Sequence, residues 1–281
     1  MPETPVAESR IAQALEATYR ELLANCEALR VRLPARGRAP RGQEWISATE
    51  LSPNLERLLA GEAARVLAAH GHLAREHVAA SRLLHHYLWS LCLLVSGPWY
   101  LARRVPRIRH EDLWLDPATG DLALLPGAFA CLPDDPAAGR PGVRTVAGED
   151  ELRAELRAAV AEHVEPVLAA FQRPLRRGQR ALWGMATDDL VSGIWYLGRM
   201  LGEEDQAVRA ATALLPGDTA PFPGAADFRR LTGTDGRDHL TRTRLGCCLY
   251  YAIRPADTCL TCPRTCDAER VRRLGAAAPT E

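Results

Sequence analysis

The chain has 281 residues, of which 47% are hydrophobic and 25% are charged, and its 35 basic residues are balanced by 35 acidic ones. This composition is typical of a globular protein with one large domain or two modest ones. A formal net charge of zero excludes a global attraction to nucleic acid or to an anionic membrane surface. All the basic residues are arginine, so Schiff-base chemistry on a lysine is excluded as well.

The start of the chain and its most apolar stretch predict a cytoplasmic protein. Residues 1–10, MPETPVAESR, lack the charged-then-apolar pattern of a signal peptide. The apolar run LWSLCLLV, residues 88–95, is bounded by His85-His86 and by Gly97-Pro98. It is far shorter than the roughly 20 apolar residues that span a bilayer, so no membrane span is expected.

The first hundred residues predict helices. Apolar residues recur every three or four positions over residues 8–33, and the Pro/Gly/Arg-rich run 34–43 predicts a loop. Two more helices are predicted, from Asn54 to about His72 and from about Leu73 to Val95. The second of these should break at Gly97-Pro98, because proline lacks the backbone N–H that a helix needs.

The next hundred residues predict a small β element and then more helices. Within residues 107–125, two leucine-rich runs flank the turn sequence DPATGD, which indicates a β-hairpin. A Pro/Gly-rich connection, residues 131–145, should follow without regular structure. Helices are then predicted over Asp150–Gln172, Leu182–Leu201 and Glu203–Leu215, before a loop at 216–228.

These elements predict an α+β fold that is predominantly α-helical, with a small antiparallel β element and a C-terminal cysteine loop. We expect two segments in the chain. Residues 1–235 would form a helical body with the hairpin, and residues 236–281 would form a metal-binding segment.

The cysteines of the C-terminal segment carry the strongest functional signal. Five of the eight cysteines lie between Gly246 and Cys266. Cys247 and Cys248 are adjacent, and Cys259 and Cys262 form a C-x2-C step, whose short turn lets both sulfurs face one metal. Adjacent side chains of an extended chain point to opposite faces, so the first pair needs a sharp bend, which Gly246 would help to form.

Three chemistries compete for these thiols. Zinc sites more often use C-x2-C twice, whereas a cluster with two iron atoms has two attachment points and accommodates an adjacent pair more naturally. Disulfides are disfavoured in a reducing compartment. The spacing therefore favours an iron–sulfur centre, with a structural zinc site as the alternative.

The pattern C-C-x10-C-x2-C near the C-terminus resembles the [2Fe–2S] motif of the FhuF-type ferric-siderophore reductases. It covers Cys247, Cys248, Cys259 and Cys262 with the spacing intact. The segment ALWGMATDDLVSGIWYLGR, residues 181–199, also resembles a helix of that family that begins with Trp-Gly. The resemblance implies a [2Fe–2S] cluster held by these four cysteines, with no separate catalytic residue.

What the resemblance implies about activity is reduction of a ferric siderophore, most often a hydroxamate, by one electron. Siderophore oxygens are hard ligands that suit Fe(III) and hold Fe(II) much less well, so one electron releases the metal without hydrolysis. The partners would be the ferric siderophore and an electron-donor protein or another reductant. Cys266 departs from the pattern as a bystander or a spare ligand, and C-x2-C-x3-C leaves a [4Fe–4S] centre open.

Two other functional classes fit the same cysteines. One is an iron or redox sensor, or a siderophore-binding protein, without reductase turnover. The other is a zinc-stabilised structural module, in which the metal contributes folding energy only.

Arginines surround the cysteine motif. Residues 236–274 contain eight arginines and four acidic residues, a local excess of +4 in a neutral chain. Such charges would raise the potential of an anionic cluster or receive an acidic electron-donor protein. The alternative is a solvated helix face over residues 267–273.

The other cysteines, the Asp188-Asp189 pair, the histidines and most of the tryptophans are interpreted as structural residues. Cys26, Cys92 and Cys131 are expected to be buried thiols, and the Asp188-Asp189 pair is expected on a helix surface. The histidines share no convincing metal-ligand spacing, and the chain has no glycine-rich nucleotide-binding loop. Most of the tryptophans should be core residues, with one or two available to line a siderophore pocket.

Overall fold

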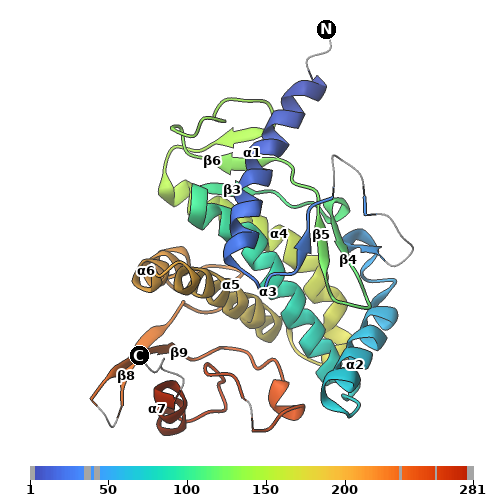
Figure 1. Ribbon diagram of the computed structural model, residues 1–281, viewed down its shortest axis with the longest axis vertical. Coiled ribbons are helices and arrows are strands. Elements are labelled where there is room, and N and C mark those ends of the chain that lie inside the picture. The colour runs from blue at the N-terminus through green and yellow to red at the C-terminus, as the bar shows by residue number, and fades with distance from the viewer. Residues whose placement is uncertain (1–3, 35–38, 41–44, 234–235, 257, 277–281) are drawn as a thin grey trace.

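The computed structural model describes residues 4–34, 39–40, 45–233, 236–256 and 258–276. It confirms the predicted fold class, because helices dominate and the strands are short (Figure 1). Most of the predicted loop at 34–43 lies outside the described residues. The helices are α1 (Thr4–Asn25), α2 (Leu55–His70), α3 (Glu76–Ala102), α4 (Glu149–Leu175), α5 (Gln179–Met200), α6 (Glu204–Leu214) and α7 (Asp267–Ala276).

Helix α3 is the centre of the body and packs against α1, α2, α4 and α5. The predicted break at Gly97-Pro98 is wrong, because α3 continues through both residues to Ala102. Pro98 cannot donate to the carbonyl four residues earlier, and the hydroxyl of Tyr19 donates to that carbonyl of Leu94 instead, at 3.0 Å. Gly97 is needed because a Cβ there would lie 2.6 Å from the side chain of Leu22 in α1.

Among the described residues, α3 is the one helix long and apolar enough to cross a membrane by length and composition. Within the fold, 78% of its apolar window is buried. This is the environment of the core helix of a globular protein.

The body contains two small sheets. The first has the order β1-β5-β4-β2 and includes the predicted hairpin, in which β4 and β5 are antiparallel. The second has the order β3-β6-β7. Two expectations are therefore wrong: residues 31–32 are a strand rather than helix, and residues 131–145 contain part of β6 and all of β7. The strands are β1 (Val31–Arg32), β2 (Ile46–Ser47), β3 (Arg104–Pro106), β4 (Leu113–Leu115), β5 (Leu122–Leu124), β6 (Phe129–Cys131) and β7 (Val143–Thr145).

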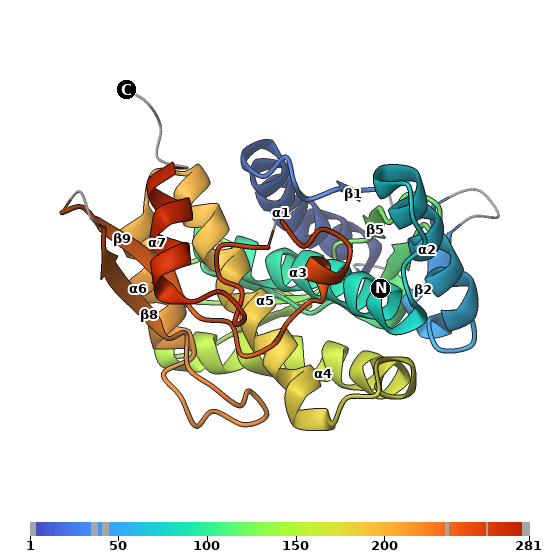
Figure 2. The ribbon, with the colours of Figure 1, turned by 90° about the horizontal axis from the view of Figure 1, so that it is seen from below.

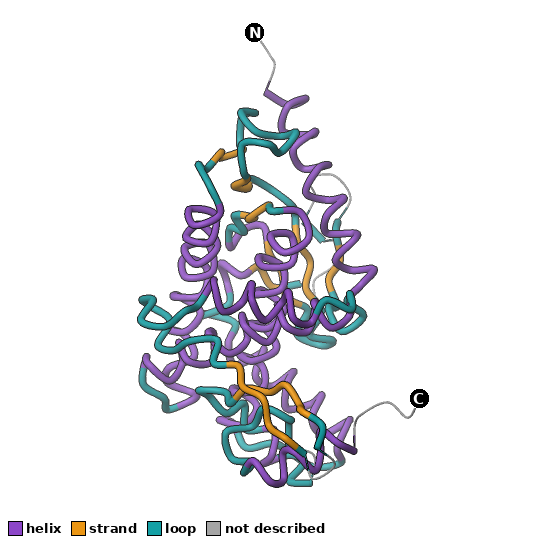
Figure 3. The backbone as a smooth tube through the Cα atoms, turned by 90° about the vertical axis from the view of Figure 1, so that its left-hand side faces the viewer, coloured by secondary structure: helices purple, strands orange, loops and turns teal. Residues whose placement is uncertain are grey.

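The C-terminal segment lies across one end of the helical body. The chain enters this segment through an antiparallel hairpin of β8 (Phe228–Thr232) and β9 (Asp238–Arg242), which the sequence did not predict. In the tube view this hairpin is well separated from the other strands (Figure 3). The cysteine loop then runs over α3 and α5 towards α7 (Figure 2). Ile253 in this loop packs with Val66 of α2 and Val78 of α3 in a small separate apolar cluster.

The proposed boundary between residues 235 and 236 falls within the β8–β9 hairpin. The division of the chain into a body and a metal-binding segment stays a prediction.

Candidate metal centre

One small pocket in the C-terminal segment is lined by all four predicted ligands, Cys247, Cys248, Cys259 and Cys262. Cys248 and Cys262 are buried, whereas Cys247 and Cys259 are partly exposed. Cys266 is exposed and is not part of this lining. The structure thus brings the four motif cysteines together and leaves the fifth outside.

Two local turns bring the sulfurs into this pocket. The backbone bends at Leu245 and Gly246, as expected, and Leu249 adopts a left-handed conformation with φ 61°. Its N–H donates to the sulfur of Cys247 at 3.4 Å. In the second turn, the N–H of Cys262 donates to the carbonyl of Cys259 at 3.0 Å.

The thiols interact with one another and with nearby cations. A hydrogen bond from Cys259, together with the nearby side chains of His85, Arg244 and Arg82, lowers the pKa of Cys248 to about 4 although burial opposes this. The same contact with Cys248 raises the pKa of Cys259. This environment stabilises a thiolate, which is the form that binds a metal.

Asp188, in the middle of α5, holds the backbone just before the cysteines. Its side chain is fully buried, so the expected position on a helix surface is wrong. One carboxylate oxygen accepts the N–H of Gly246 at 2.7 Å, and the other accepts the N–H of Leu245 at 3.0 Å. Burial raises the pKa of Asp188, and these hydrogen bonds and the charge of Arg242 oppose that rise.

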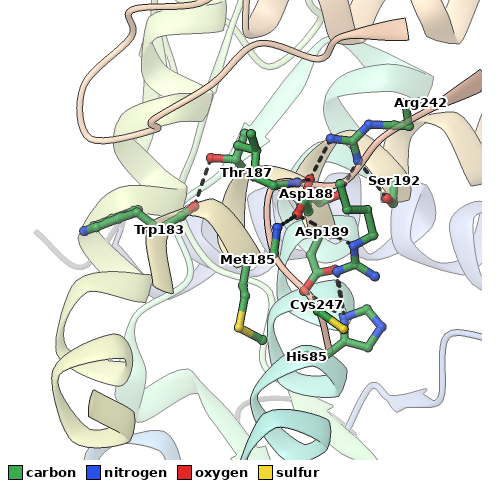
Figure 4. A network of polar contacts seen from close by, with 12 residues as sticks. His85, Trp183, Met185, Thr187, Asp188, Asp189, Ser192, Arg242 and Cys247 are labelled. Atoms are coloured by element: carbon green, nitrogen blue, oxygen red, sulfur yellow. Dashed lines mark hydrogen bonds and ion pairs between the residues drawn. The ribbon is translucent and has the colours of Figure 1, made fainter. Parts of the chain in front are cut away.

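Arg242, at the end of β9, closes the same network (Figure 4). Its guanidinium is fully buried and donates to Asp188 Oδ1 at 2.7 Å, to Ser192 Oγ at 3.2 Å and to the carbonyl of Ala226 at 3.0 Å. A buried guanidinium is tolerated only when its donors and its charge are matched in this way. The pair therefore fixes the hairpin and the start of the cysteine loop to α5.

Asp189 forms a second buried pair, with Arg244. Arg244 Nη2 donates to Asp189 Oδ1 at 2.7 Å, and His85 Nδ1 of α3 lies 2.9 Å from Asp189 Oδ2. The carboxylates of Asp189 and Asp188 raise the pKa of Arg244 although burial opposes them. Arg244 Nε makes no hydrogen bond among the described residues and lies 3.7 Å from Asp188 Oδ2, and the Arg244 side chain also lines the cysteine pocket.

Arg270 of α7 ties the second pair of cysteines to the helix that follows. Its side chain is 1% exposed, and it donates to the carbonyls of Leu260 at 3.0 Å, Cys262 at 2.8 Å and Thr265 at 3.2 Å. The expectation of a solvated face over residues 267–273 thus fails for Arg270 and fits Arg272, which is exposed.

A larger cavity of about 350 Å³ lies beside the cysteine pocket. Two helices contribute to it, each with residues at positions i, i+3, i+4 and i+7, which form one helix face. From α3 these are Arg82, His85, His86 and Trp89, and from α5 they are Ser192, Trp195, Tyr196 and Arg199.

The third side of this cavity belongs to the metal-binding segment. Leu260 and Thr261, the two residues inside the C-x2-C step, line the cavity together with Arg244. Arg244 also lines the cysteine pocket, so its side chain lies in the wall between the two spaces. Arg82 contributes to the same wall, because its guanidinium lies 4.9 Å from the ring centroid of Tyr250, which lines the cysteine pocket.

The cavity was not predicted from the sequence, although the sequence of α3 contains a signal for it. A stripe of Arg, His and Trp at i, i+3, i+4 and i+7 interrupts the otherwise apolar helix α3, and a buried helix keeps such residues only where they face a polar space. The expectation for the isolated thiols is confirmed, because Cys26, Cys92 and Cys131 are fully buried. The expectation that most tryptophans are core residues is wrong, because only Trp99 and Trp183 are buried and the other four are partly exposed.

These features define a helical protein with a pocket lined by four cysteine thiols beside a polar and aromatic cavity. A two-iron cluster takes its thiolate ligands in two pairs, and the pocket is lined by two such pairs, Cys247 with Cys248 and Cys259 with Cys262.

Residues 244–264 match the family model of the FhuF 2Fe-2S C-terminal domain. This confirms the resemblance seen in the cysteine spacing, and the segment is a [2Fe–2S] cluster domain of that type. No curated protein sequence matches the chain significantly.

Proposed function

We propose that the protein is a cytoplasmic ferric-siderophore reductase. It takes one electron from a donor protein or another reductant and passes it to siderophore-bound Fe(III), giving Fe(II), which the chelate releases. Each reduction oxidises the donor by one electron and breaks no covalent bond of the siderophore. The hydroxamate class of siderophore is carried over from the family resemblance.

One observation supports this function above the others. Arg244 lines both the cavity and the cysteine pocket and so lies in the wall between them, and the Leu260-Thr261 turn between Cys259 and Cys262 lines the cavity side of that wall. When bound, the [2Fe–2S] cluster supplies single electrons, and a chelate in the cavity would be separated from it only by this wall. A structural zinc module has no need of such a cavity.

The residues of the chain then have separate tasks. We propose that Cys247, Cys248, Cys259 and Cys262 hold the cluster. Asp188 and Arg270 fix the two turns that carry them, by the hydrogen bonds described above. The faces of α3 and α5 bind and orient the chelate and keep bulk water away from the shared wall.

The test is ferrous iron release by anaerobically purified protein. The holoprotein should contain two irons and two sulfides per chain, and after chemical reduction it should transfer iron from a ferric hydroxamate to a ferrous-specific chelator. Colourless, zinc-containing protein would refute the cluster, and chelate binding without Fe(II) release would refute the reductase.

The ligand assignment has its own test in a matched pair of variants. Cys259→Ser should lose the visible absorption and the iron, because Cys259 lines the pocket. Cys266→Ser should retain both, because Cys266 lies outside it. Loss of the cluster in Cys266→Ser would show that the assignment is wrong.

A further inference from the structure

The cavity beside the cysteines is unevenly charged. Three arginines, Arg82, Arg199 and Arg244, line it, and its lining includes no aspartate or glutamate. His86 also lines it, but burial lowers the pKa of His86, so its ring is neutral near pH 7. His85, which lines the cavity as well, lies 2.8 Å from a carboxylate oxygen of Asp189, so the permanent charges that a ligand would meet in the lining are guanidinium groups.

The three arginines differ in how far their charge is already balanced. Arg244 is held by Asp189 at 2.7 Å and lies 3.7 Å from Asp188. Arg199 lies 3.8 Å from Glu204, and both of these side chains are about half exposed, at 54% and 43%. A loose pair of this kind contributes little and rearranges easily.

Arg82 has no carboxylate within ion-pair distance among the described residues, and the contact found for it is the ring of Tyr250. A cation over a tyrosine face is held in position without being neutralised. Arg82 is therefore a positioned positive charge at the cavity wall, and a guanidinium is suited to binding a carboxylate in a bidentate manner.

The rest of the cavity is aromatic. Trp89 of α3 meets Tyr196 of α5 edge to face, with ring centroids 5.6 Å apart. Trp195 is held by a hydrogen bond from its indole N–H to Glu204, at 2.8 Å. These held rings give the cavity apolar surface beside its charged groups, since the guanidinium of Arg199 lies 5.8 Å from the Trp195 ring centroid, and this favours a ligand with apolar arms around a charged centre.

We propose that the cavity selects ferric chelates with a net negative charge, such as hydroxamates that also carry free carboxylates, over neutral hydroxamates. Arg82 is the residue that sets this preference, by pairing with a carboxylate of the bound chelate. The inference rests on the proposed function, because it takes the substrate of that reaction to be the ligand of this cavity.

The test separates binding from reduction by using gallium. Ga(III) has the charge of Fe(III) but is not reduced, so its chelates report binding alone. Affinities of the holoprotein are measured by titration calorimetry for two Ga(III) hydroxamates, one neutral and one made anionic by free carboxylates. We expect the anionic chelate to bind at least about tenfold more tightly, the effect of one good charge-assisted contact.

Two variants test whether Arg82 causes the preference for the anionic chelate. Arg82→Gln should remove most of the difference between the two chelates in protein preparations matched to the wild type in iron and sulfide content. Arg272→Gln, at an exposed arginine outside the cavity lining, should keep that difference. Equal affinities in the wild type, binding of neither chelate, or an unchanged preference in Arg82→Gln would each overturn the proposal. A clear preference without Fe(II) release from the ferric chelates would support it and refute the reductase.

Discussion

The Asp188→Asn variant tests whether the buried ion pair in α5 organises the metal-binding segment. Asp188 and Arg242 both have side chains with 0% exposure, and their closest N–O distance is 2.7 Å. An asparagine would leave the Arg242 charge buried without its partner. It would also replace one oxygen by an NH2 group, which would face the N–H of either Leu245 or Gly246.

The expected cost follows from these contacts. Removing one partner of a buried ion pair costs about 3–5 kcal/mol, which is a large part of the roughly 5–15 kcal/mol that stabilises a typical domain. Unfolding in urea, followed by far-UV circular dichroism, should show a midpoint lowered by about 1 M or more. Because Asp188 holds the N–H groups before Cys247, iron and sulfide content should fall as well.

The matched control is Asp205→Asn in α6, which removes an ion pair with Arg230 at a side chain that is 74% exposed. This change should alter stability by less than about 0.5 kcal/mol and leave the iron content unchanged. If Asp188→Asn loses less than about 1 kcal/mol and keeps its full iron content, the carboxylate does not organise the cysteine loop.

Three further predictions concern the body and the cluster segment. Burial lowers the pKa of His163 to about 4. As the pH falls from 6.5 to 4, His163 is protonated in the unfolded state before it is protonated in the folded state, so the free energy of unfolding should fall by roughly 3 kcal/mol. His163→Gln should flatten this part of the curve of unfolding free energy against pH. Gly198→Ala would place a methyl group 2.2 Å from the Cβ of Ala207 in α6 and should lower the free energy of unfolding in urea by about 1–3 kcal/mol. Gly178→Ala, whose methyl group would meet nothing within 4 Å, should leave the free energy of unfolding unchanged. Arg270→Met should make the holoprotein lose its visible absorption faster than Arg272→Met, because Arg270 donates to carbonyls of the cysteine loop whereas the hydrogen bonds found for Arg272 go to Glu269; equal rates would contradict this.

The sequence by itself determined the features that depend on residues close together along the chain. Helix periodicity places α2, α4, α5 and α6 to within a few residues, and the DPATGD turn places the β4–β5 hairpin, because both patterns are local. The cysteine spacing identified the cluster segment for the same reason, since a C-x2-C turn brings two sulfurs together within four residues.

Only the tertiary structure decided which polar residues are buried and what they serve. Asp188 and Asp189 meet arginines more than 50 residues away along the chain, and no local pattern shows that such charges are matched. Pro98 stays inside a helix because Tyr19, from another helix, supplies a hydrogen-bond donor to Leu94. The cavity likewise exists only where α3, α5 and the cysteine loop meet, because packing between distant segments creates its walls.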